Sequence, residues 1–245
     1  MKQSIWAQSA LPLYDVGTRI QVGLRVFHYC RAITALGNKR GEGDGGTLLE
    51  MLNAAVVAPA GALSVTLVTV APVLNEYAGG WFAAFDGAAV LPAVTLVRVR
   101  SNAAPVGANT TFALQDPLPR AVRIAGADSC DVYRNIYNNL TTRAGGPVGA
   151  SSQSAVCIPL IDVTINNYFW GQTWGPCLGI AHAAGGLGAV AGEADVWFSD
   201  DGTIATQAEC ASGVLSQYAG YMLGDRRSAA GVLGDSIFFM LKLAP

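Results

Sequence analysis

Apolar and polar residues alternate along several stretches of this chain, and that alternation is the pattern of β-strands with one buried face. In TRIQVGLRVFHYCRAI (18–33), the side chains of Ile20, Val22, Leu24 and Val26 fall on one face, and the same period extends to His28. Similar runs are LSVTLVTV (63–70), TTFALQD (110–116), AVCIPLIDVTI (155–165) and DSIFFMLKLAP (235–245). Turn signals such as Asp86-Gly87 and Asp201-Gly202 separate these runs. The pattern predicts an all-β chain of sandwich- or barrel-type domains with short hairpins, and at most one or two short helices.

The run AVTLVRVRS (93–101) predicts a strand with two different ends. Val97 and Val99 share one face and are expected to point inward, with Arg98 and Arg100 on the other face. At its start, this strand is apolar on both faces. The conformation of one segment is undecided between helix and strand. This segment, GGTLLEMLNAAVV (45–57), contains several good helix formers in a row.

Domain boundaries are expected where apolar periodicity stops. The clearest such stretch is TTRAGGPVGASSQS (141–154), which is rich in Gly, Ser and Ala. We therefore expect an N-terminal arm with the first strands (1–55), a central β domain (56–143) and a C-terminal β domain (144–245). The alternative is that these regions form one intertwined unit.

The most unusual stretch is NYFWGQTWGPCLGIAH (167–182), which concentrates aromatic residues beside a Cys and a His. As a strand, it would place Tyr168, Trp170 and Trp174 on one face. Such a ladder of aromatic side chains suits either a pocket or a packing and contact surface. Because no catalytic partner accompanies it, the packing interpretation is favoured.

Cys177 and His182 are the candidate nucleophile and base, but their odd spacing puts them on opposite faces of an extended strand. All five cysteines are far apart in sequence, with no CxxC pair, so free buried thiols are expected rather than a zinc site. The acidic residues Asp200 and Asp201 read as a hairpin tip rather than a calcium loop. We therefore predict no catalytic residue, no cofactor and no metal, and a protein that is not an enzyme.

Charge is scarce: only 13% of the residues are charged, against about a quarter in typical soluble domains, and the net charge is −2. The exterior must therefore be neutral and polar or be covered by a partner, and we favour extensive subunit contact over a monomer. No basic stripe indicates nucleic-acid binding. The uncharged stretch 51–75 is interrupted by Pro59 and Pro72, so we do not expect it to span a membrane. The N-terminus lacks a continuous apolar run, so we do not expect a secretory signal there.

The segments GTRIQVGLRVFHYCRAITAL and DSIFFMLKLAP, together with the Trp-rich centre, resemble viral shell and phage virion proteins in their β-rich, charge-poor, Ala/Gly/Thr-heavy style. Within that group, the chain resembles decoration or cement proteins of the phage head, and almost as well a small coat protein. The resemblance implies a subunit of the capsid surface that is made in the host cytoplasm and docks on the major capsid protein. It also implies a homo-oligomer, trimer or dimer, without nucleic-acid or membrane partners.

Under this hypothesis, aromatic and apolar residues make the contacts, and the arm acts as a clamp. The expected contact residues are Trp6, Leu11, Leu13, Tyr14, Phe27, Tyr29, Tyr168, Trp170 and Trp174. Core burial is the competing explanation for each of them, and it is at least as good for Phe27 and Trp170.

Two other classes of function remain open. In a carbohydrate- or receptor-binding protein of a phage tail or fibre, Trp81, Trp174 and Trp197 would stack on sugar rings, with Glu193 and Asp200 as candidate carboxylates. The third class is an enzyme that uses Cys177 as its nucleophile.

Overall fold

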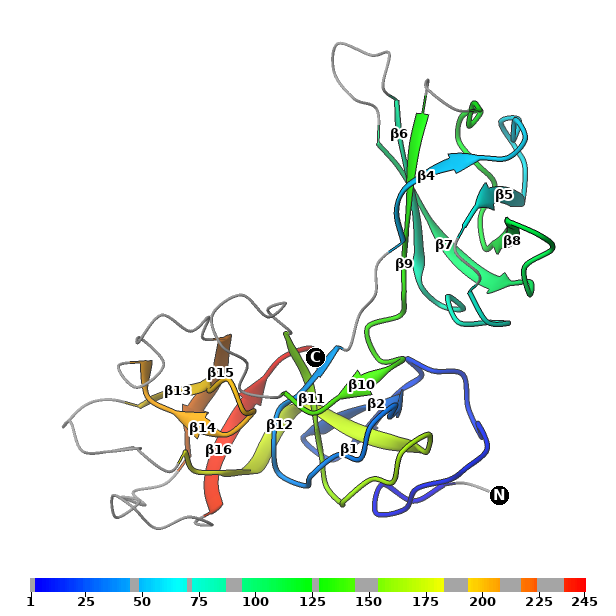
Figure 1. Cartoon of the computed structure of the whole chain (residues 1–245). Helices are drawn as coiled ribbons and strands as arrows, with labels where there is room; N and C mark the ends of the chain where they lie inside the picture. Colours follow the sequence, from blue (N-terminus) through cyan, green and yellow to red (C-terminus); the bar gives the residue numbers. More distant parts are fainter. Residues whose placement is uncertain are drawn as a thin grey trace. The chain divides into compact units, whose positions relative to one another are not determined.

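The computed structural model describes residues 3–44, 49–69, 72–86, 94–124, 128–143, 154–182, 194–207, 217–223 and 236–245. All elements described in these residues are β-strands, and their ladders are antiparallel (Figure 1). The prediction of an all-β chain is therefore confirmed. The part of the chain that the structure describes contains no helix long and apolar enough to cross a membrane.

By its internal contacts, the chain divides into two units: unit 1 consists of residues 1–45 and 137–245, and unit 2 consists of residues 46–136. Unit 2 is thus an insertion between the first strands of unit 1 and the rest of it. These limits differ from the boundaries at 55/56 and 143/144 that composition alone indicated. Each unit is described below by itself.

Unit 1 is built on one curled antiparallel sheet of ten strands. Its strands are β1 (Arg19–Val22), β2 (Arg25–Arg31), β3 (Glu42–Asp44), β10 (Leu140–Thr141), β11 (Ala155–Pro159), β12 (Tyr168–Ile180), β13 (Asp195–Phe198), β14 (Ile204–Ala205), β15 (Gln217–Met222) and β16 (Ser236–Lys242). The main path runs β10-β3-β11-β12-β16-β15-β13-β14, and β2 pairs with both β1 and β12.

The long strand β12 organises this sheet. Its first half pairs with β2, where Trp170 lies opposite Tyr29, and its second half pairs with β16, where Cys177 lies opposite Phe239. The register shifts between Gln172 and Trp174. Gly175, with φ +94°, follows this bulge, and a Cβ there would lie 2.2 Å from a backbone carbonyl oxygen. A glycine is therefore required where β12 changes partner.

Three apolar clusters fill unit 1. The first contains Phe198 and Phe239, and the second contains Phe169 with Cys30 and Cys157. The third consists of Phe27, Tyr29 and Trp170 with the side chains packed on them. Phe169 and Trp170 belong to different clusters because consecutive residues of a strand face opposite sides of the sheet.

Unit 2 is a closed six-stranded barrel with the order β4-β5-β8-β7-β6-β9. Its strands are β4 (Leu49–Ala54), β5 (Ser64–Val68), β6 (Trp81–Asp86), β7 (Val94–Asn102), β8 (Asn109–Leu114) and β9 (Asp128–Tyr133). The interior is packed with side chains such as Phe82, Phe112 and Leu114. In β7, Val97 and Val99 point inward and Arg98 outward, as the alternation predicted, while Val94 and Leu96 are exposed.

The helical option for residues 45–57 is wrong where the structure describes them, since Leu49–Ala54 forms β4. This strand pairs with β5 on one side and β9 on the other. Its backbone groups are needed to close the barrel, and such tertiary pairing overrides the local helix preference of Leu, Glu and Met.

Candidate functional site

The N-terminal arm, residues 3–16, is anchored on β2 and β12 by hydrogen bonds. Ser9 and Tyr168 exchange two backbone bonds of 2.9 and 2.7 Å. The Tyr29 hydroxyl donates to Oε1 of Gln3 (2.7 Å), and the Trp170 indole N–H donates to the Gln3 carbonyl (3.3 Å). These contacts hold the arm on unit 1 at several points of its length.

The anchored arm also covers part of the aromatic core. The ring of Tyr14 packs against Tyr29 and Trp170, with centroid separations of 5.3 and 5.1 Å. Phe27, Tyr29 and Trp170 are almost wholly buried in this cluster. For these three of the expected contact residues, burial fits the core explanation that the sequence left open, and they present no surface to a partner.

The other expected contact residues retain exposed surface. On the arm, Trp6 is 58% exposed, Leu11 70% and Leu13 47%. Tyr14, Tyr168 and Trp174 are partly buried. The arm thus combines a fixed backbone with three exposed apolar side chains.

The three tryptophans proposed to stack on sugars lie on three different strands, β6, β12 and β13. Trp81 belongs to unit 2, whereas Trp174 and Trp197 belong to unit 1, where β16 and β15 lie between their strands. Trp197 is partly buried and packs edge-on against Tyr218. Trp81 is 45% exposed and lies opposite Tyr133, which is also exposed. The carbohydrate-binding hypothesis also uses the carboxylates of Glu193 and Asp200. Glu193 lies outside the described residues.

The geometry around Cys177 does not favour a thiol nucleophile. Its side chain is buried in the cluster of Phe198 and Phe239, and burial raises the pKa of the thiol to about 12. Burial alternates along the end of β12, so Cys177 faces the core while His182 lies on the more accessible side. Cys30, Cys130, Cys157 and Cys177 are free and buried, which confirms the expectation for these four thiols. Cys210 lies outside the described residues.

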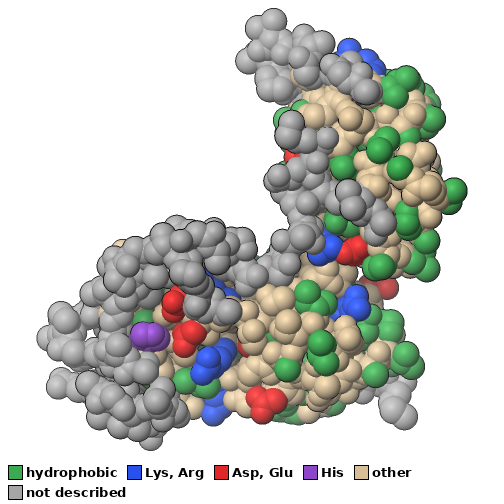
Figure 2. All heavy atoms as spheres, in the orientation of Figure 1, with side chains coloured by type: hydrophobic (Ala, Val, Ile, Leu, Met, Phe, Trp, Pro, Cys, Tyr) green, Lys and Arg blue, Asp and Glu red, His purple; other side chains and the backbone are tan. Residues whose placement is uncertain are grey.

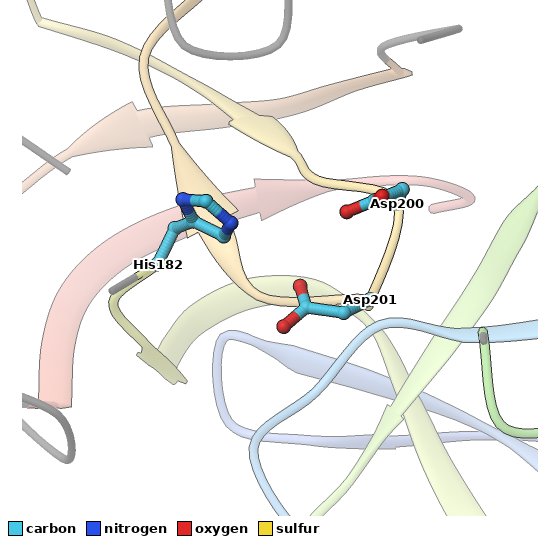
Figure 3. A group of neighbouring side chains, drawn as sticks. All are labelled: His182, Asp200 and Asp201. Carbon is cyan, nitrogen blue, oxygen red and sulfur yellow. The ribbon is translucent and has the colours of Figure 1, made fainter. Parts of the chain in front are cut away.

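His182 instead meets two carboxylates from another part of the chain. Its backbone N–H donates to the carbonyl of Ile204 in β14 (2.9 Å), next to a parallel bridge between Ala181 and Ile204. The turn between β13 and β14 carries Asp200 and Asp201, as the hairpin-tip prediction had it. One ligand atom from each of the three side chains lies within 4.8 Å of the others (Figure 3).

The β13–β14 turn has a well-defined backbone. Gly202 adopts φ +77°, its N–H donates to the Ser199 carbonyl (3.1 Å), and its own carbonyl accepts from the N–H of Gly41 (2.7 Å). A Cβ on residue 202 would lie 2.3 Å from the Gly41 carbonyl oxygen. A glycine at position 202 is therefore required by both the conformation and the close approach.

The two carboxylates use only part of their hydrogen-bonding capacity inside the turn. Oδ1 of Asp201 accepts from the backbone N–H (3.0 Å) and the hydroxyl of Thr203, and Oδ1 of Asp200 accepts from the Ser199 hydroxyl (3.0 Å). Oδ2 of Asp201 lies 3.8 Å from Nη1 of Arg40. Nδ1 of His182 is buried and has no hydrogen-bond partner within the described ranges.

This cluster was missed in the sequence because its members are separated along the chain and meet only through strand pairing. No local motif places residue 182 beside residues 200 and 201. Compared with protein-family models, curated proteins and solved structures, the chain shows no match to any of them.

Proposed function

We propose that the protein is a structural subunit of a virus particle, a capsid decoration protein that docks on the major capsid shell and self-associates. The observation that carries the proposal is the anchored arm with Trp6, Leu11 and Leu13 exposed on it. Large apolar side chains on an ordered segment bury area against a partner without the entropy cost of ordering that segment. The resemblance in sequence style to virion proteins supplies the kind of partner.

The surface of the barrel adds a second region suited to subunit contact. Single exposed apolar residues are ordinary, but here they lie on three adjacent strands: Tyr133 on β9, Trp81 on β6, and Val94 and Leu96 on β7. Figure 2 shows apolar side chains at several places on the visible surface of unit 2. Two weak contact regions on one subunit increase its overall binding through multivalency.

The arm can be tested by changing its exposed side chains without touching its anchors. A variant with Trp6→Ser, Leu11→Ser and Leu13→Ser keeps Gln3, Ser9 and Tyr14 in place. We expect it to lose at least tenfold in affinity for purified particles that lack the wild-type protein, measured by co-sedimentation. Deletion of residues 1–14 is less informative because it also removes the Tyr14 ring from the core.

The matched control carries Val22→Ser and Leu24→Ser, two exposed apolar residues of the β1–β2 hairpin, in the same unit. Binding of this control should equal that of the wild type, and circular dichroism should show the same fold for all three proteins. If the arm variant binds as tightly as the wild type, the arm is not the clamp. If the wild type does not sediment with particles at all, the decoration role is refuted.

One observation favours a second candidate, a receptor- or carbohydrate-binding protein of a tail or fibre. Trp81 and Tyr133 are adjacent, exposed aromatic side chains on the outside of the barrel, and aromatic rings of this kind stack on sugars. Titration of a broad glycan panel, followed by tryptophan fluorescence, would show a change that Trp81→Phe weakens and that Trp197→Phe leaves intact. A panel without any fluorescence change removes this candidate.

A further inference from the structure

His182, Asp200 and Asp201 bring an imidazole and two carboxylates to one place in unit 1, and nothing in the proposed capsid role accounts for them. Figure 3 shows the His182 ring at the end of β12, facing the turn that carries both aspartates. We propose that these three side chains form a binding site for a divalent transition-metal cation, of which Zn²⁺ and Mn²⁺ are examples.

The distances fit this interpretation. The three ligand atoms lie within 4.8 Å of one another. Ligands held about 2.1 Å from a tetrahedral ion are about 3.4 Å apart, so closing the site requires side-chain movements of roughly 1 Å. The backbone need not move: the β13–β14 turn is fixed through Gly202 and Gly41, and His182 is fixed through Ile204.

The charges fit as well. Two neighbouring carboxylates repel each other, and among the described ion pairs only Arg40 faces them, at 3.8 Å from Asp201. The side chain of Asp200 is in no ion pair within the described part of the chain, and it accepts a hydrogen bond from the Ser199 hydroxyl. A bound cation would neutralise the pair, and both carboxylates keep an oxygen outside the hydrogen bonds of the turn.

The donor atoms indicate the class of ion. One imidazole nitrogen with two carboxylate oxygens is a mixed set that suits first-row divalent metals, whereas Ca²⁺ takes six to eight oxygen ligands. The three side chains are each partly exposed, so an ion can enter from solvent. Once bound, it would join the end of β12 to the β13–β14 turn and stabilise unit 1.

The chain has only two histidines, and this makes the test direct. His28 is buried, stacks on Tyr137 and hydrogen-bonds through Nδ1 to the Thr173 hydroxyl, so it serves as an internal control. The full-length protein, without a histidine tag, is titrated with Zn²⁺ and followed by NMR of the two imidazole rings. We expect the ring signals of His182 to shift and those of His28 to keep their positions.

Calorimetry with Mn²⁺, which prefers oxygen and imidazole ligands to thiols, gives the affinity. We expect His182→Ala and Asp200→Asn each to weaken binding at least tenfold. Asp15→Asn, which removes one exposed carboxylate elsewhere in unit 1, should leave it unchanged. Arg40→Gln, which removes the competing cation, should strengthen binding severalfold.

The proposal is overturned if neither ion shifts or broadens the His182 signals. It is also overturned if binding persists unchanged in His182→Ala or Asp200→Asn, because the ion then lies elsewhere. A variant that fails to fold is recognised by the loss of the dispersed His28 signals. In that case the same titration is made with Asp201→Asn, which should weaken binding, and with Arg40→Gln, which should strengthen it. Unchanged binding in both variants overturns the proposal.

Discussion

Replacing Glu42 with Gln should stabilise unit 1 at neutral and alkaline pH. Glu42 lies in β3, is 1% exposed, and its Oε1 atom has no hydrogen-bond partner among the described residues. Burial raises the pKa of this carboxyl to about 8, although backbone N–H groups of Gly37 and Arg143 and the charge of Arg40 act in the opposite direction. The folded state therefore favours the protonated acid.

The sign and size of the effect follow from proton linkage. Between the ordinary pKa of 4.5 and the folded value of about 8, the folded state binds a proton that the unfolded state has lost. The stabilising contribution is complete below pH 4.5 and disappears as the pH rises through 8. The free energy of unfolding should fall by about 1.4 kcal/mol per pH unit inside this range, or roughly 1.5 kcal/mol from pH 6.5 to 8.0.

This window isolates Glu42 from the other perturbed groups. Burial lowers the pKa of His28 to about 4 from 6.5, so its contribution is lost at lower pH, as the pH falls through that range. Burial raises the pKa values of the Cys130 and Cys177 thiols to about 12, and in the unfolded state, with the ordinary value of 9.0, only about a tenth of these thiols is ionised at pH 8. From pH 6.5 to 8.0 Glu42 therefore dominates the slope, and His28 adds a smaller change of about 0.4 kcal/mol in the opposite direction.

The assay is urea unfolding at pH 6.5 and 8.0, followed by tryptophan fluorescence. A Trp81→Phe background leaves the remaining four tryptophans in unit 1, so the signal reports that unit. The free energy of unfolding should fall from pH 6.5 to 8.0 when Glu42 is present and should be nearly independent of pH in Glu42→Gln. The control Asp15→Asn should show the same fall as the protein with wild-type Glu42 and Asp15. A flat wild type, or a Glu42→Gln variant that retains the slope, would refute the assignment of a protonated buried Glu42.

Three further predictions address single positions. Asp128 is a carboxylate with a buried side chain that is paired with Arg120 and with the more exposed Arg123, so Asp128→Asn should destabilise unit 2 by about 1 kcal/mol in urea unfolding, and wild-type stability would contradict the importance of this pairing. Gly175→Ala should destabilise unit 1 by about 2 kcal/mol or more, since φ is +94° and the added Cβ meets a backbone carbonyl; wild-type stability would contradict the close approach. Cys177 should react with a thiol reagent at pH 8 only after unfolding, as mass spectrometry of the labelled protein would show, and rapid labelling of the folded chain would disprove its burial.

The sequence predicted the parts of the fold that depend on local alternation. In β7, the spacing of Val97 and Val99 against Arg98 set the inward and outward faces correctly, because a strand has a fixed period of two. The segment now known as β4 was ambiguous, since its Leu, Glu and Met residues suit a helix as well. Only the pairing of β4 with β5 and β9 decides its conformation, and this pairing is a long-range property of the barrel.

The candidate sites likewise combine features that the local sequence predicts with features that depend on long-range contacts. The arm residues Trp6, Leu11 and Leu13 were identified from their apolar character, and their exposure could be judged only after the arm was seen docked on β2 and β12. The proximity of His182 to Asp200 and Asp201 was not predictable, because it depends on a parallel bridge between the end of β12 and β14. The spacing of residues along the sequence does not reveal such a long-range bridge.

The most direct test of the proposed function is the copy number of this chain in purified virus particles. Quantitative mass spectrometry measures it against the most abundant shell protein. A capsid decoration protein should be present at a count comparable to that shell protein or at a simple fraction of it. A handful of copies would contradict the decoration role and favour a tail or vertex protein, and complete absence from the particles would contradict the virion proposal altogether.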